Sequence, residues 1–174
     1  RERAEKVKQG NPLDPATTMG AMVDVNHAKK VEEFLNVGKA EAKLITGGDR
    51  FSINDSDAFI QPTIFADVSE DATIARDEIF GPVLAIQTFD TENEAIEMAN
   101  KSVYGLAASV WTSDLARAMD LSDKLHVGTV SVNTVDALSA MTPFGGMKQS
   151  GFGRDLSIHS FDKYTALKTI WVKY

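Results

Sequence analysis

Residues 143–154 combine glycines with cationic side chains in a pattern that could bind or position a ligand. The segment holds four glycines together with Lys148, Ser150 and Arg154. Glycine lets the backbone adopt positive φ and approach another chain or a ligand closely, while Lys and Arg supply fixed positive donors. A tight surface turn is the alternative for an isolated Gly-Gly pair. We expect the Lys, Ser and Arg to have structural rather than catalytic roles, because Arg donates readily to carbonyls and carboxylates across a packed boundary.

Glu78 and Phe80 are candidates for holding a nucleotide. Both come just before the apolar run that opens at Pro82. A carboxylate in this place can accept hydrogen bonds from both hydroxyls of a ribose, and a neighbouring aromatic ring can pack beside a nicotinamide. Taken singly, the two residues could equally be an exposed acid and a core phenylalanine.

A third candidate region lies between Asn133 and Phe144, where the chain has neither helical nor strand periodicity. Loops that follow strands often carry specificity. Asp136 in this loop is either a turn former or a group that faces a cationic or polar substrate tail.

Alternating strands and helices from residue 82 onward are expected to position these candidates. Apolar runs predict strands at residues 82–89, 106–111 and 129–133. A capping box at residues 91–94 opens a helix to about Lys101, and Ser113 or Asp114 caps a second. The side chains expected to face inward are Ala95, Met98 and Ala99 on the first helix and Leu115, Ala118, Met119 and Ser122 on the second. Short links imply an α/β fold with an open, mostly parallel sheet and flanking helices, and the glycine-rich loop then follows the last strand, where such sheets form ligand crevices.

The first half of the sequence predicts further elements. A charged helix opens the chain, and a turn-rich connector follows at residues 10–15. Asp24 or Asn26 caps a helix to about Lys39, with Ala28, Val31 and Leu35 on one face. Residues 43–46 predict a short strand, and residues 59–65 an extended segment that Pro62 confines to an edge or a bulge. At the other end, residues 165–174 are β-prone and would form an exposed edge, so we expect this strand to pair with another domain or subunit.

Composition narrows the function classes. The net charge of -7 is spread without long runs, which argues against nucleic acid or an anionic membrane as partner. No apolar run reaches the roughly 18 residues that span a bilayer, and the charged start is unlike a signal peptide, so we expect a cytoplasmic protein. The chain has no cysteine, which excludes disulfides, Cys–metal sites and a thiol nucleophile within these 174 residues. The three histidines, His27, His126 and His159, share no metal-ligand spacing, so we expect them to be solvated or to cap helices. Residues 145–150 lack the Lys-Ser adjacency of a P-loop.

Three motifs in order resemble the C-terminal part of the NAD(P)-dependent aldehyde dehydrogenases. They are Glu78-Ile79-Phe80-Gly81-Pro82-Val83, Asn100-Lys101-Ser102-Val103-Tyr104-Gly105-Leu106 and the glycine-rich residues 143–154. The resemblance implies that Glu78 holds the nicotinamide ribose of NAD or NADP and that Phe80 packs near the ring. It also implies that the aldehyde tunnel is lined by Asp136, Ala137, Leu138 and Phe144. Some family members bind a monovalent cation between subunits through backbone oxygens, which would here lie near Lys148 and Gly151.

The resemblance also implies that the chain is part of a longer enzyme. Family members attack the aldehyde with a cysteine thiol, pass hydride to the nicotinamide and hydrolyse the thioester with an activated water. Since the chain has no cysteine, we expect the nucleophile, the general base and an N-terminal cofactor domain to lie outside it. Residues 1–164 would then be the C-terminal part of the catalytic domain, and residues 165–174 the oligomerisation strand of a dimer or tetramer. A catalytically incompetent folding or oligomerisation module is the alternative.

The end of the chain resembles one branch of the family most. Residues 148–155, His159, residues 162–165 and residues 167–171 look like the γ-glutamyl-γ-aminobutyraldehyde dehydrogenases of polyamine catabolism. The resemblance implies an aminoaldehyde substrate, although Asp155 stands where many relatives carry Glu.

Overall fold

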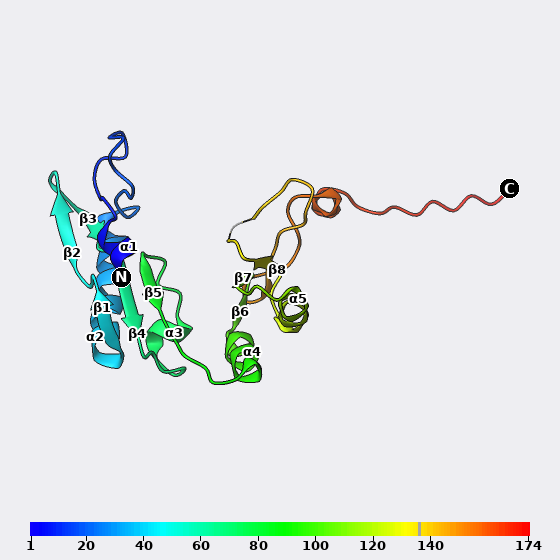
Figure 1. The fold of residues 1–174 in the computed structure, drawn as a ribbon. Helices are drawn as coiled ribbons and strands as arrows, with labels where there is room; N and C mark the ends of the chain where they lie inside the picture. Colours follow the sequence, from blue (N-terminus) through cyan, green and yellow to red (C-terminus); the bar gives the residue numbers. More distant parts are fainter. Residues whose placement is uncertain (136) are drawn as a thin grey trace. The chain divides into compact units, whose positions relative to one another are not determined.

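The computed structural model describes residues 1–135 and 137–174, which form two compact units, Arg1–Phe89 and Asp90–Tyr174 (Figure 1). Each unit has its own helices and strands. None of the helices in the described part of the chain combines the length and apolarity needed to cross a membrane.

Helix α2 (Val25–Glu41) supplies much of the core of the first unit. Its N-cap is Asp24, whose side chain accepts a hydrogen bond from the His27 backbone N–H at 2.7 Å. Three- and four-residue spacing places Ala28, Val31 and Leu35 on one face, and all three are fully buried. The cap at Asp24 and this apolar face are confirmed.

The first unit also contains two short helices. Helix α1 (Glu2–Glu5) opens the chain, and a hydrogen bond from Arg1 Nε to Glu5 Oε1 at 2.8 Å lowers the pKa of the Glu5 carboxyl. Helix α3 (Thr73–Arg76) is fastened to the end of α2 by Glu41. The Glu41 carboxylate accepts from the Thr73 backbone N–H at 2.8 Å and from its hydroxyl at 2.7 Å.

Strands β1 (Lys43–Thr46), β4 (Thr63–Ala66) and β5 (Val83–Ala85) form a sheet in the order β1-β4-β5. Strand β4 is antiparallel to β1 and parallel to β5. Phe65 of β4 is fully buried against α2, where a Cβ added to Gly38 would lie 2.7 Å from its ring. Glycine at position 38 therefore lets the helix and this strand approach closely.

Strands β2 (Arg50–Ile53) and β3 (Ser56–Ile60) form a hairpin. Asn54 and Asp55 between them have φ of 48° and 63°. Positive φ at both turn positions is typical of a type I′ turn, which Asn and Asp tolerate. Pro62 lies between β3 and β4, so the extended segment expected at residues 59–65 is divided into two strands.

The second unit contains a parallel strand-helix-strand arrangement. Helix α4 (Glu92–Lys101) precedes β7 (Ala107–Val110), helix α5 (Leu115–Lys124) and β8 (Thr129–Val132). Strands β7 and β8 pair in parallel from Ala107 opposite Thr129 to Val110 opposite Val132. The capping box of α4 is confirmed: Thr91 Oγ1 accepts from the Glu94 N–H at 3.2 Å, and Glu94 Oε2 accepts from the Thr91 N–H at 3.4 Å.

Two-residue strands β6 (Tyr104–Gly105) and β9 (Met147–Lys148) pair antiparallel and tie the glycine-rich segment to the region after α4. A 3₁₀ helix, η1 (Ile158–Lys163), follows. Residues 165–174, drawn in red in Figure 1, are exposed and contain neither helix nor strand. The expected strand is thus not formed within the described chain, and its pairing with another subunit stays a prediction.

The α/β class is confirmed, but the strand pairs are mixed. Among the described residues, β4–β5 and β7–β8 are parallel, whereas β1–β4, β2–β3 and β6–β9 are antiparallel. The strand expected at residues 82–89 is only β5, which pairs with β4. Ala99, Leu115 and Met119 were expected to face inward and are exposed, because the two-stranded β7–β8 sheet is too narrow to cover a whole helix face.

Candidate functional site

Glu78 and Phe80 lie in the irregular segment between α3 and β5. Ile79 between them is partly buried and packs against the hydrophobic core of the first unit. Its two neighbours are exposed, and 74% of the Phe80 surface is accessible. The core thus anchors the segment by its middle residue and leaves the two candidate side chains open to a ligand.

The residues after Phe80 fix the segment to helix and sheet. A Cβ added to Gly81 would lie 2.9 Å from Val31 Cγ1, so the backbone here runs directly against α2. The Pro82 carbonyl accepts a hydrogen bond from the Thr63 N–H at 2.8 Å, at the start of β4. Only glycine allows the backbone at position 81 to lie this close to Val31. The hydrogen bond at Pro82 comes directly before the β4–β5 pairing.

His27 on the first turn of α2 contacts Phe80 twice. Its Nε2 lies 2.8 Å from the Phe80 carbonyl oxygen. The two rings also meet edge to face, with centroids 6.2 Å apart and an interplanar angle of 78°. Phe80 adopts a positive φ of 55°, which is uncommon for a bulky residue. Sequence reasoning assigned His27 a solvated or capping role and missed this contact.

The Glu78 carboxylate has no hydrogen-bond or ion-pair partner within residues 1–135 and 137–174. An ionised carboxylate offers only acceptor sites, so it can receive both hydroxyls of a diol. Glu78 is therefore free to bind a ligand, and its role in holding a ribose stays a prediction.

The glycine-rich segment of the second unit is closed at its ends by an antiparallel bridge. Phe144 N–H donates to the Asp155 carbonyl at 2.9 Å, and Asp155 N–H donates to the Phe144 carbonyl at 2.7 Å. Inside the loop, a Cβ added to Gly146 would lie 2.5 Å from the Ser150 carbonyl oxygen. The glycine is needed because the backbone folds back on itself at this point.

Lys148 fastens this loop to the end of α4. Its Nζ donates to the Asn100 carbonyl at 2.8 Å and to the Ser102 carbonyl at 2.9 Å. A cation at the C-terminal end of a helix is favourable because the last carbonyls there have no intrahelical partner.

Arg154 and Ser150 make further internal contacts. Arg154 Nη1 donates to the Gly146 carbonyl at 2.9 Å, and Ser150 Oγ accepts from the Gly105 N–H at 3.1 Å. The contacts of Lys148, Ser150 and Arg154 agree with the architectural role expected for them.

The described residues offer no group of three or more His, Cys, Asp or Glu side chains placed to hold a metal ion. Lys148 and Gly151 both have positive φ, and the Gly151 N–H donates to the Lys148 carbonyl at 3.3 Å. The monovalent cation expected near these two residues would need backbone oxygens, and it stays a prediction.

The candidate substrate loop begins at Asn133, just after β8. The Asn133 side chain pairs with the Thr112 backbone: Oδ1 accepts from the Thr112 N–H at 2.9 Å and Nδ2 donates to its carbonyl at 2.8 Å. Asn133 has a φ of 54°, and Ser109 Oγ donates to the Thr134 carbonyl. These contacts direct the chain away from the β7–β8 sheet.

Of the residues expected to line the aldehyde tunnel, Ala137 and Leu138 are exposed and Phe144 is half-buried. Asp136 lies outside the described residues, so its predicted role stays a prediction.

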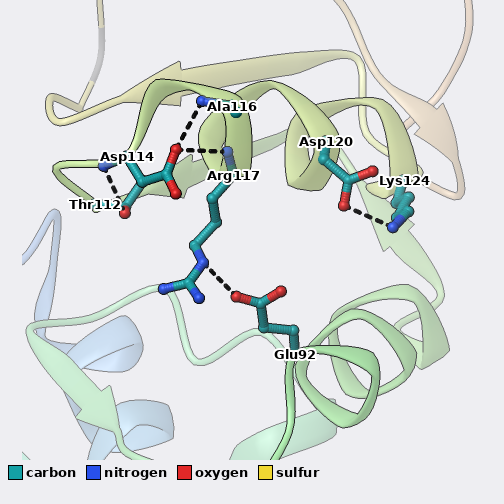
Figure 2. Close-up of polar contacts among 7 residues, drawn as sticks. All are labelled: Glu92, Thr112, Asp114, Ala116, Arg117, Asp120 and Lys124. Atoms are coloured by element: carbon teal, nitrogen blue, oxygen red, sulfur yellow. Dashed lines mark hydrogen bonds and ion pairs between the residues drawn. The ribbon is translucent and has the colours of Figure 1, made fainter.

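Polar contacts cap α5 and link it to α4. Figure 2 shows Asp114 at the N-terminus of α5, where Oδ1 accepts from the Ala116 and Arg117 N–H groups at 2.9 and 3.2 Å. Asp114 rather than Ser113 is therefore the N-cap. The Arg117 side chain reaches α4, with Nε 2.5 Å from Glu92 Oε1. The two helices that flank β7 are thus linked by an ion pair.

The first unit contains a cavity of about 320 Å³. It is lined by Ala4, Glu5, Val7, Gln9, Thr46, Gly47, Phe51, Gln61 and Pro62. None of these is a residue that the sequence predicted to bind cofactor or substrate.

The sequence model of the aldehyde dehydrogenase family matches residues 1–170. The chain therefore belongs to the aldehyde dehydrogenase family. It is 46% identical over 172 residues to the NADP/NAD-dependent aldehyde dehydrogenase PuuC of Escherichia coli, covering 99% of this chain and 34% of that protein. It is 47% identical over 174 residues to betaine aldehyde dehydrogenase 1 of Rhizobium meliloti, covering 99% and 36%.

The fold agrees with solved structures of the family. The chain superposes with a TM-score of 0.94 and 46% identity on an indole-3-acetaldehyde dehydrogenase, AldA of P. syringae, in complex with NAD+ and IAA. The match covers 99% of this chain and 35% of that chain. The chain thus spans about a third of the length of the relatives it matches.

Proposed function

We propose that this chain forms the C-terminal part of the catalytic domain of an NAD(P)-dependent aldehyde dehydrogenase. The observation that carries the proposal is the exposed carboxylate of Glu78, which has no partner among the described residues, beside a Phe80 held in a left-handed conformation. Family membership and the NAD+ complexes of similar structures support it.

The residues present fit a dinucleotide. Glu78 would accept the two hydroxyls of the nicotinamide ribose, and the exposed ring of Phe80 would pack beside the nicotinamide. The bound cofactor supplies the acceptor for the hydride that leaves the substrate. Either NAD or NADP is compatible with these two residues, since neither would touch the ribose that distinguishes the two cofactors.

The proposed substrate is an aldehyde, oxidised to a carboxylate, and specifically an aminoaldehyde of the kind formed in polyamine catabolism. The ground for this choice is the resemblance of residues 148–171 to the γ-glutamyl-γ-aminobutyraldehyde dehydrogenases. Overall identity does not discriminate, since it is 46% to PuuC, 47% to betaine aldehyde dehydrogenase 1 and 46% to the indole-3-acetaldehyde dehydrogenase. Within the chain, residues 134–142 and Phe144 would line the approach to the reacting carbon, with Asp136 facing a cationic tail.

The nucleophile must come from outside these 174 residues, because the chain has no cysteine. We infer that a longer gene product supplies it, together with the general base and the N-terminal cofactor domain. Homo-oligomerisation through residues 165–174 and a cytoplasmic location remain part of this proposal. The second candidate, a module that folds and associates without catalysis, is favoured by the same lack of cysteine.

An assay of the gene product that contains this chain separates the two candidates. We expect it to reduce NAD or NADP when supplied with an aminoaldehyde, whereas residues 1–174 expressed alone should give no turnover above a no-protein blank. Inactivity of the gene product toward a panel of aliphatic, aromatic and amino aldehydes would favour the module without catalysis. Turnover by the repurified 174-residue chain would contradict the proposal that the nucleophile lies outside it.

A further inference from the structure

Phe80 is a strained residue in an exposed position. Its φ of 55° is left-handed, although its side chain is large and 74% of its surface is accessible. A left-handed conformation is unfavourable for a non-glycine residue because its Cβ crowds the neighbouring carbonyl oxygen. Strain of this kind persists only where the surrounding structure enforces it, and it is concentrated at functional sites.

Burial of Phe80 cannot be the source of this enforcement, because the ring lies largely in solvent. The enforcing contact is His27, which engages the residue at both its carbonyl and its ring. A carbonyl oxygen can only accept, so Nε2 of His27 carries the proton and donates over the 2.8 Å distance. The edge-to-face contact then restricts how the Phe80 ring can turn.

His27 is itself held by a rigid element. Its backbone N–H donates to the Asp24 cap at 2.7 Å, and its helix neighbours Ala28 and Val31 are fully buried. Gly81, directly after Phe80, packs on the same Val31. The helix therefore holds the segment at two successive residues, through a hydrogen bond at Phe80 and through close packing at Gly81.

We propose that His27 is a positioning residue, which holds Glu78 and Phe80 in the geometry that receives the cofactor through its bond to the Phe80 carbonyl. The inference rests on the proposed function, since it concerns the same segment. Without the Nε2–H donor, only the packing of Ile79 and Gly81 on either side would oppose the strain, and Phe80 itself would relax toward a right-handed backbone. Glu78, two residues earlier, would then lose its fixed place while the core contact of Ile79 remained.

Two substitutions of His27 separate the donor from the side-chain volume. His27→Leu keeps an apolar side chain but removes the donor, and His27→Gln keeps an N–H donor of similar reach. His126→Leu is the matched control, because His126 is exposed and its ring makes no hydrogen bond within the described part of the chain, whereas its backbone N–H donates to Asn100 Oδ1 at 2.7 Å. All three are made in the gene product that contains this chain.

Hydrogen exchange of the unliganded protein is the first measurement. His27→Leu should speed amide exchange at residues 79–81 and 83, whereas His27→Gln and His126→Leu should leave it near the wild-type rate. Unchanged exchange in His27→Leu, or equal acceleration in His27→Gln, would overturn the proposal. If His27→Leu does not fold, the comparison of His27→Gln with wild type decides alone, because the proposal requires the amide donor to preserve protection.

Titration with NAD is the second measurement. The dissociation constant of His27→Leu should rise about tenfold, which corresponds to about 1.4 kcal/mol, and His27→Gln should recover most of the loss. At saturating cofactor the turnover number should fall less than the affinity. Faster exchange with unchanged NAD affinity would overturn the positioning role. Wild-type protein that shows the exchange pattern but binds no NAD would refute the proposed function and leave the His27–Phe80 contact standing.

Discussion

The side chain of Asn133 pairs with the backbone of Thr112 through both its oxygen and its nitrogen, at 2.9 and 2.8 Å. The amide thus continues the β7–β8 pairing for one more residue after the strand has ended. Because Asn133 is left-handed, the chain turns there into residues 134–142. The start of the candidate substrate loop is set by this pair.

Asn133→Ala should destabilise the protein more than Asn133→Gly. Both lose the two hydrogen bonds, at about 1 kcal/mol each. Ala should lower the free energy of unfolding by roughly a further 1 kcal/mol, because it disfavours the left-handed backbone that glycine adopts freely. Thermal unfolding of the two variants measures the difference. Ala as stable as Gly would contradict a left-handed residue at this position.

Asn100 should contribute to the stability of the second unit. Its Oδ1 accepts from the His126 N–H at 2.7 Å and its Nδ2 donates to the Lys124 carbonyl at 2.8 Å. Asn100→Ala should cost about 1–2 kcal/mol by leaving both groups unpaired. Asn93→Ala, on an exposed position of the same helix, is the control and should be neutral or slightly stabilising. Equal melting temperatures for the two variants would remove Asn100 from this role.

Asp136→Asn should raise the KM for aminoaldehydes several-fold and leave a neutral aliphatic aldehyde nearly unchanged. The reason is that the amide no longer attracts a cationic tail. Steady-state kinetics on the two substrates give the answer. Equal effects on both would assign Asp136 to the turn of its own loop.

Deletion of residues 165–174 should lower the oligomeric state of the gene product. The segment is exposed throughout, including Trp171 at 92%, and has no strand partner within the described chain. An unpaired β-prone run of this kind is suited to edge pairing with a second copy, usually with two-fold symmetry. Light scattering measures the mass. A truncated protein with the parent's mass would show that this segment is not the interface.

Local features of the fold could be predicted from sequence, and contacts across the chain could not. The caps at Asp24 and Asp114 were predictable because a cap bonds a backbone N–H two or three residues away. The buried face of α2 follows from helical spacing in the same way. His27 escaped prediction because its partner, Phe80, is 53 residues away.

Strand pairing shows the same limit. The run at residues 82–89 is apolar throughout, yet only Val83–Ala85 forms β5, because a strand extends only as far as its partner β4. Residue types also indicated Glu78 as a ligand group, but only the structure shows that its carboxylate has no partner in residues 1–135 and 137–174.

The most direct test of the account is Glu78→Gln in the gene product that contains this chain. Asp77→Asn, the same loss of charge at an exposed neighbour, is the matched control. A neutral amide forms a weaker hydrogen bond to ribose than a carboxylate does, by about 1–2 kcal/mol. We predict that pre-steady-state hydride transfer slows about tenfold or more in Glu78→Gln, with NAD affinity reduced and melting temperature unchanged. Hydride transfer and NAD affinity equal to those of Asp77→Asn and wild type would contradict the assignment of Glu78 to the cofactor site.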